Sequence, residues 1–311
     1  MNIFQDYMVH EYVADYQQGH LSRRDLIRRV IFITGGVASA ATVLSNFSLT
    51  GVTTALAQTP PTPRSPLSVP ADDPSIEGMG ITFPGQDGAT IMAYQARPAG
   101  ASDALPLVLV CEQNRGVDEH IRDVTRRWAK EGYVACAVDL LSREGGTAAI
   151  TDPNQFAAYL TGPNVDQNQF VADFAAAVDY YAGQSALVDV DHIGMNGFCF
   201  GGGVTWRSTE AIDQLKAAVP FYGAPPPLEQ VGNIKAAVLG VYSSDPNDFA
   251  NAHRDDLDAA LTAAGVVHQF KVYPDTHHAF NDDTGAAYNE QQALAAWSDA
   301  TTWMKQYLVA A

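Results

Sequence analysis

The stretch GMNGFCFGGGV, residues 194–204, indicates how this chain folds. It begins within an apolar run typical of a strand, His192–Asn196, and a helical pattern follows from near Gly201. Gly197 and Gly201 flank Cys199 where the strand turns into the helix. Strand and helix pack too closely in such a turn for side chains at the flanking positions, and the central residue is displayed as a nucleophile. The alternative is a buried thiol that only fills space, which is common for free cysteines.

Strands and helices alternate on both sides of this turn. The continuous apolar run Leu107–Cys111 is typical of a strand covered on both faces, and Ile121, Val124 and Trp128 recur after it at helical spacing. This alternation predicts a single α/β domain with a mostly parallel sheet wound by helices on both faces. The other strands expected are 133–138, 217–221, 236–242 and 269–273, and the helices expected are 118–132, 169–184, 251–265 and 290–307.

Two later loops carry partners for Cys199. Functional residues of parallel sheets lie at the carboxyl ends of strands, and Asp245 and His278 each follow an expected strand. A thiol nucleophile needs a base, and the base needs a group that orients it. The chain order nucleophile, acid, histidine is that of the α/β-hydrolase fold. We therefore expect a triad of Cys199, His278 and Asp245, with Asp248 in the same loop as the alternative to Asp245.

From about residue 76 to its end, the chain resembles the dienelactone hydrolase family. The motifs that carry this resemblance are GFCFGGG around Cys199, SSDPND from residue 243, THHAF from residue 276, and NRGVDEHIRDVTRRWAKEGYVACAVDLLSREGGT at 114–147. The resemblance implies an α/β-hydrolase fold with Cys199 as nucleophile, His278 as base and Asp245 as its orienter. It also implies an oxyanion hole formed by the backbone N–H groups of Asn114 and Phe200.

Two positions depart from the best-known members of the family. Those members have a glutamate three residues before the glycine matched by Gly116, and here that position is Gln113, with Glu112 one residue earlier. They also hold a substrate carboxylate with two arginines; Arg143 matches one, but the other position is Asp282. A site with one arginine fewer and one carboxylate more favours an uncharged ester or lactone. Dienelactone itself remains the alternative substrate.

Other residues near these motifs are candidates for the substrate pocket. Arg115 lies on a strand-end loop, where it lines the pocket or pairs with a surface acid, and Phe198 is pocket wall or core. His277 and His278 are neighbours in an extended segment and point opposite ways, so we expect no metal site there, and no cofactor is predicted. The three cysteines do not form a disulfide framework, because their number is odd.

Composition excludes some classes of partner. The 311-residue chain has a formal net charge of −17 at pH 7, whereas nucleic acids and anionic membrane surfaces require basic patches. We therefore expect a small-molecule substrate and no nucleic acid.

The N-terminus has the features of an export signal. Residues 22–28, SRRDLIR, resemble the twin-arginine pattern, an uncharged stretch follows at 30–63, and Ala55-Leu56-Ala57 is a small-x-small cleavage site. The expected organisation is a signal peptide at 1–57, a stiff proline-rich linker at 58–75 and a catalytic domain at 76–311. Cleavage after Ala57 by way of the twin-arginine export machinery predicts a periplasmic or extracellular protein without stable membrane association. An uncleaved membrane anchor is the alternative.

The sequence thus predicts an exported carboxylic-ester or lactone hydrolase that works through an S-acyl enzyme at Cys199. One alternative is a carboxymethylenebutenolidase proper, acting on dienelactone. Another is a catalytically silent ligand-binding protein on the hydrolase fold, since fold does not fix function.

Overall fold

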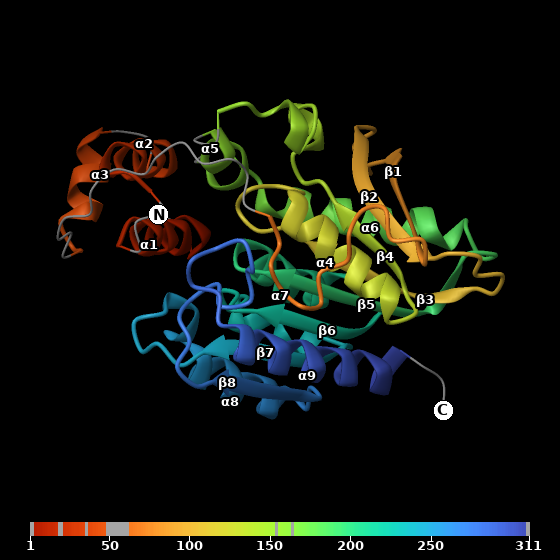
Figure 1. Ribbon diagram of the computed structural model, residues 1–311. Coiled ribbons are helices and arrows are strands. Elements are labelled where there is room, and N and C mark those ends of the chain that lie inside the picture. The colour runs from red at the N-terminus through yellow and green to blue at the C-terminus, as the bar shows by residue number, and fades with distance from the viewer. Residues whose placement is uncertain are drawn as a thin grey trace.

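A computed structural model describes residues 3–17, 21–34, 37–47, 62–152, 155–162 and 165–308 (Figure 1). The expected cleavage site after Ala57 lies outside the described residues. An eight-stranded sheet with the order β1-β2-β4-β3-β5-β6-β7-β8 forms the centre. Its strands are β1 (Ile76–Pro84), β2 (Thr90–Pro98), β3 (Leu105–Cys111), β4 (Val134–Val138), β5 (Val188–Phe198), β6 (Leu215–Phe221), β7 (Ala237–Ser243) and β8 (His268–Tyr273).

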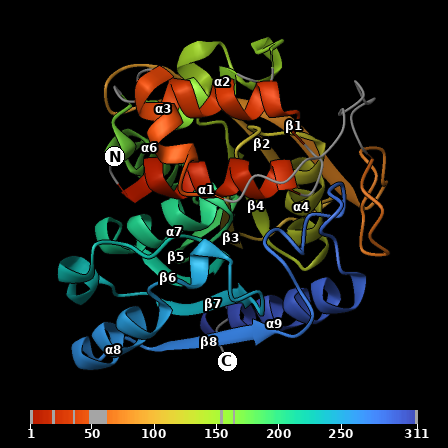
Figure 2. The same cartoon turned by 90° about the vertical axis from the view of Figure 1, so that its left-hand side faces the viewer.

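The strands from β3 to β8 are parallel, and β1 and β2 add an antiparallel hairpin at one edge. Helices cover both faces. Figure 2 shows α6 (Gln167–Ala182), α7 (Phe200–Ala211) and α8 (Arg254–Ala264) on one side, and α4 (Glu119–Lys130) and α9 (Glu290–Leu308) on the other. The single α/β domain expected from the alternating pattern is confirmed. The hairpin was not among the expected strands, because its burial alternates and its apolar positions do not form a continuous run.

Local signals in the sequence fix the ends of α4. The Asp118 carboxylate accepts a hydrogen bond from the N–H of Ile121 at the helix start, and Gly132 takes a positive φ of 95° just beyond its end. Trp128 is fully buried and donates its indole N–H to Asn196 on β5, 3.1 Å away. This contact ties the helix to the strand that leads to Cys199.

Three N-terminal helices pack on the same body: α1 (Ile3–Gln17), α2 (Arg23–Thr34) and α3 (Val37–Leu44). Apolar residues of α1 and α2, such as Val9 and Leu26, belong to one hydrophobic cluster with residues of the sheet. Among the described residues, no helix combines the length and the apolar character that a membrane span requires.

The segment expected as a stiff linker, 58–75, packs against the domain over its described part, 62–75. The carboxylate of Asp283 accepts hydrogen bonds from the backbone N–H groups of Arg64 and Ser65 at 3.1 and 2.9 Å. Asp123 accepts from the N–H of Val69 at 2.6 Å, and Val69 is buried. The linker prediction is therefore wrong for residues 64–69, because buried carboxylates bind their backbone; composition alone gave no sign of these partners.

Candidate active site

The turn at Cys199 has the geometry that its glycines predict. Cys199 has a φ of 59° and lies between the end of β5 and the first residue of α7. A Cβ at Gly197 would overlap the carbonyl oxygen of Gly201 and the hydroxyl of Thr205. A Cβ at Gly201 would overlap backbone atoms at the end of β3. Glycine is required at both flanks because the backbone segments touch.

Cys199 and His278 lie in direct contact. The Nε2 atom of His278 is 3.2 Å from the Sγ atom of Cys199, and the Nδ1 atom of His278 is 3.0 Å from Oδ1 of Asp248. All three side chains are nearly inaccessible in the full chain, with exposed fractions of 1% for Cys199, 6% for His278 and 5% for Asp248. The arrangement is that of a nucleophile, a base and a group that orients the base.

The acid of this arrangement is Asp248, which corrects the expectation of Asp245. Asp245 lies 2.7 Å from Nδ1 of His277, whose side chain is 69% exposed. The N–H of Asp248 donates to the carbonyl of Asp245, and this turn carries the later aspartate back to the buried histidine. Sequence position after the strand does not distinguish the two aspartates, because the loop conformation decides which one is buried.

The surroundings of Asp248 keep it ionised. Burial by itself would raise the pKa of its carboxyl, but the charge and hydrogen bond of His278 and the hydroxyl of Ser243, 2.5 Å away, bring the pKa below its usual value. The imidazole of His278 packs between aromatic rings, with centroid distances of 4.6 Å to Phe249 and 4.9 Å to Tyr222. Its rotamer is therefore fixed by packing as well as by hydrogen bonds.

The two segments expected to supply oxyanion donors lie next to each other. Gly201, one residue after Phe200, approaches the backbone of Glu112 and Cys111, which lead into the turn containing Asn114. Asn114 and Phe200 are both buried. The approach of Gly201 to Glu112 brings together the two segments from which the expected oxyanion donors come.

Gln113 and Asp282, the two positions that depart from the family pattern, are joined by a hydrogen bond. The side-chain amide of Gln113 donates to Oδ2 of Asp282 at 3.1 Å. A glutamate at position 113 would instead set two carboxylates against each other, so the uncharged amide fits the nearby aspartate. The neighbouring Glu112 is fully buried, and this burial, with the charge of Asp139, raises the pKa of its carboxyl well above the usual range.

The other pocket candidates have different surroundings. Arg143 forms ion pairs with Asp173 at 2.7 Å and Asp87 at 3.0 Å, so its charge is already matched by two carboxylates. The substrate-binding role expected of Arg143 stays a prediction, and a substrate anion would compete there with these two carboxylates. Phe198 is fully buried with its ring 4.8 Å from that of Phe221, so it belongs to the core, whereas Arg115 is half-buried in the turn after β3.

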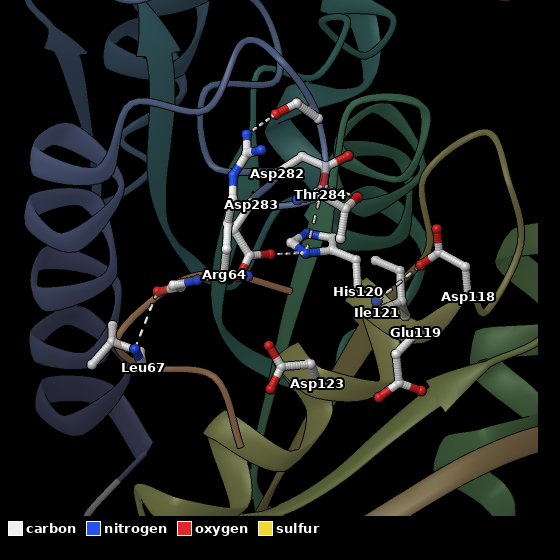
Figure 3. A network of polar contacts seen from close by, with 12 residues as sticks. Arg64, Leu67, Asp118, Glu119, His120, Ile121, Asp123, Asp282, Asp283 and Thr284 are labelled. Carbon is white, nitrogen blue, oxygen red and sulfur yellow. Dashed lines mark hydrogen bonds and ion pairs between the residues drawn. The ribbon is translucent and has the colours of Figure 1, made fainter. Parts of the chain in front are cut away.

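A charged network lies beside the triad loops (Figure 3). His120 on α4 is fully buried, with Nδ1 at 2.8 Å from Asp283 and 3.7 Å from Asp282. Burial alone would lower the pKa of His120, but the charges of Asp282, Asp118 and Asp283 and the hydrogen bond to Asp283 raise it to about 8. Because Asp282 also accepts from Gln113, the network joins α4, the turn after β3 and the segment that follows His278.

His120, Asp282 and Asp283 are close enough together to suggest metal ligands among the described residues. The positive charge there belongs to the protein itself, because Arg127 donates to Asp283 at 2.7 Å. The other donors to Asp283 are His120 and the backbone of residues 64–65. These contacts occupy both oxygens of Asp283, so we interpret the group as an ion-pair network that fixes the segments around the site.

A model of the family described as "Dienelactone hydrolase family" matches residues 91–308. The chain belongs to the dienelactone hydrolase family. Two bacterial relatives, each named "Putative carboxymethylenebutenolidase", are 35% identical: the one from Salmonella typhi over 79% of this chain and 93% of its own length, and that from Escherichia coli (strain K12) over 76% and 89%.

Among solved structures, one described as "Putative Dienelactone Hydrolase" from Klebsiella pneumoniae is 33% identical, with a TM-score of 0.68. The match covers 75% of this chain and 99% of that chain. That solved chain therefore has no counterpart for about a quarter of the present chain. The helices α1, α2 and α3 lie outside residues 91–308, which the family model matches.

Sequence reasoning missed the burial of Asp248 and the partnership between His120 and Asp283. A signal for the first exists in the chain, since Asp248 is the N-cap of the short helix η4 (Phe249–Asn251) and binds the N–H of Ala250. The second joins residues 163 positions apart, and no local pattern reveals such a contact.

Replacing Asp248 by asparagine should lower kcat/KM for a small ester by about 10²-fold or more, because the base loses the group that holds its tautomer. The matched control is Asp245→Asn. That change should alter kcat/KM by less than about fivefold, since exposed ion pairs contribute ~1 kcal/mol or less. The measurement is the steady-state kcat/KM of both variants. A larger loss of kcat/KM in Asp245→Asn than in Asp248→Asn would contradict the assignment of Asp248 as the orienting acid.

The raised pKa of His120 predicts a pH-dependent stability. Its charged form stabilises the fold fully below the unfolded pKa of about 6.5, and this contribution disappears as pH rises through about 8. The loss amounts to about 2 kcal/mol. Urea unfolding between pH 6 and pH 9 should show this decline for the wild type and a flatter curve for His120→Gln. Parallel curves for the two proteins would exclude His120 as the titrating group.

Proposed function

We propose that this member of the family hydrolyses carboxylic ester or lactone bonds with Cys199 as nucleophile, His278 as base and Asp248 as its orienter. The contact of 3.2 Å between the thiol and the imidazole supports this proposal most directly. Family membership makes the chain a hydrolase of the dienelactone type. The proposal adds which residues perform the reaction.

The reaction has two halves. In the first, Nε2 of His278 accepts the thiol proton, and the Cys199 sulfur bonds to the carbonyl carbon of the substrate. The developing oxyanion binds the backbone N–H groups of Phe200 and Asn114; the alkoxide then leaves with the proton from His278, and an S-acyl enzyme remains. In the second half, His278 takes a proton from water, the hydroxide attacks the thioester, and the acid departs as the thiol regains its proton.

Asp248 acts on this cycle through His278. Its carboxylate accepts the Nδ1–H, which leaves Nε2 as the proton acceptor facing the sulfur. When the imidazole becomes positively charged, the adjacent carboxylate stabilises that charge. The hydroxyl of Ser243 and the N–H of Ala250 hold the carboxylate in place.

The name shared by the curated relatives supports a dienelactone, which carries a carboxylate, as the substrate class. A second candidate is an uncharged ester or lactone. It is favoured by Asp282, which brings negative charge where the resemblance implies an arginine, and by the two carboxylates that already neutralise Arg143. Both candidate substrates would be hydrolysed by the same mechanism. They differ in whether the site binds a negatively charged substrate or an uncharged one.

The mechanism is tested with residues 58–311 and a small activated ester, p-nitrophenyl acetate, under reducing conditions. The wild type should hydrolyse the ester, and Cys199→Ala should lose essentially all of this activity, because no other residue replaces the thiolate. Equal activity in both proteins would mean that the nucleophile lies elsewhere. No activity in either, across esters of several chain lengths, would favour a ligand-binding protein on this fold.

The substrate class is tested with carboxymethylenebutenolide and its methyl ester, which share one lactone ring and differ by one negative charge. Repulsion by Asp282 should make kcat/KM about fivefold higher for the methyl ester, as one charge pair near 4 Å in water contributes ~1 kcal/mol. A strong preference for the free acid would instead support a carboxymethylenebutenolidase proper.

We also propose that the protein is exported by the twin-arginine route and cleaved after Ala57. The arginine pair Arg23-Arg24 and the small-x-small site at 55–57 support this proposal. The exported protein should then begin at Gln58, and its N-terminal sequence should read Gln-Thr-Pro-Pro. Membrane-bound material that retains Met1 would show an uncleaved anchor instead.

A further inference from the structure

Helix α1 lies across the edge of the sheet where the triad is formed. It contacts η4, which follows the carboxyl end of β7, and α5 (Gln155–Thr161), which follows the carboxyl end of β4. In the sheet order, β3, β5 and β6 lie between these two strands, and β5 leads to Cys199. A helix that contacts both segments lies on the side of the sheet at which β5 leads to Cys199.

The dimensions agree with this placement. Four strand spacings separate β4 from β7, which corresponds to about 19 Å at the usual spacing between neighbouring strands. The 15 residues of α1 extend for about 22 Å. Figures 1 and 2 show α1 on the side of the sheet where α7 begins, with α2 and α3 beside it.

Phe249 lies between α1 and the base. The ring of His10 lies 6.1 Å from Phe249 in η4, and Phe249 lies 4.6 Å from the imidazole of His278. Phe249 directly follows Asp248, the acid of the triad. The N-terminal helix thus packs on the same short turn that orients the catalytic histidine.

Burial is extensive on both sides of this contact. Among the residues of α1 whose burial the structure describes, five are between 0 and 3% exposed: Met8, Val9, Tyr12, Val13 and Tyr16. They share one hydrophobic cluster with Cys199 and with Phe156 and Leu160 of α5. Helix α2 contacts α5 as well. Helix α1 packs mainly on α2, and its contacts with α5 and η4 join this apolar surface to the catalytic body.

The docked helices leave the arginine pair accessible. Arg23 and Arg24 are exposed on the outer side of α2, whereas Arg29 is buried over the ring of Tyr12 at 4.9 Å. The carboxylate of Asp25 and the hydroxyl of Ser22 cap the helix start, 2.6 Å apart. A receptor that reads the arginine pair therefore does not need to displace α1 from the catalytic edge.

We propose that helices α1, α2 and α3 form a cap that docks over the triad and blocks access to Cys199, so that the full chain is a closed precursor and removal of the cap opens the site. The chemistry of the opened site rests on the function proposed above. The docking itself does not, because it stands on the contacts of α1 with η4 and α5.

The test compares the full chain with a version whose cap is undocked, Val9→Glu/Val13→Glu, which places two charges on the buried face of α1. The matched control is Ile27→Glu on α2, because Ile27 is 37% exposed. Residues 58–311 serve as the open reference; a solved relative folds without a counterpart for a quarter of this chain. Two readouts are taken: the rate of Cys199 alkylation by iodoacetamide, measured by peptide mass, and hydrolysis of p-nitrophenyl acetate.

Alkylation of Cys199 should be about tenfold slower in the full chain than in residues 58–311, as for a site that is open one tenth of the time. The double variant should approach the fast rate, and the Ile27 variant should keep the slow one. Cys111 and Cys136 are fully buried and serve as internal controls for folding. If Cys111 and Cys136 are also alkylated in the double variant, that variant has unfolded. The presence of the cap is then judged from the alkylation rates of the full chain and of residues 58–311.

The two readouts separate the cap from the reaction. Equal alkylation rates in the full chain and in residues 58–311 would overturn the cap, whether or not ester is hydrolysed. Slow alkylation in the full chain, together with no hydrolysis by any form, would support the cap and contradict the proposed hydrolase mechanism. Slow alkylation and slow hydrolysis that rise together on undocking would support both.

Discussion

The close approach of α7 to the end of β3 is the constraint on which the rest of the site depends. Gly197 and Gly201 let the strand, the turn and the helix touch, and Cys199 adopts a positive φ between them. Any side chain at these flanks would push α7 away from Glu112 and from the turn that contains Asn114. The nucleophile and the candidate oxyanion donors are therefore positioned by one contact between backbones.

Two histidine–aspartate pairs form between the loops after β7 and β8, and they differ in burial. His277 and Asp245 meet near the surface, whereas His278 and Asp248 meet in the interior beside Cys199. Burial strengthens the second interaction because water does not compete for it. Adjacent residues in an extended segment point in opposite directions, so one loop supplies a surface pair and a triad pair at once.

Charge around the site is balanced within the protein. His120 and Arg127 face Asp282 and Asp283, and the same aspartates hold Gln113 and the backbone of residues 64–65. Burial of such acids is tolerated because each carboxylate has several donors. The network joins residues 64–65, α4 and the loop after His278. It also holds the uncharged amide of Gln113 against the carboxylate of Asp282.

The sequence by itself determined the α/β class and the alternation of strands and helices, because glycine spacing and apolar periodicity are local and leave a direct mark on the chain. The pairing of Cys199 with His278 was expected from the chain order of nucleophile, acid and histidine and from the resemblance to the dienelactone hydrolase family. The sequence did not determine which aspartate orients the base, since Asp245 and Asp248 differ only in how the loop folds. Nor did it reveal that residues 64–69 bind buried carboxylates, or that α1 packs beside the triad. Those contacts join residues far apart in the chain, and only the tertiary structure brings them together.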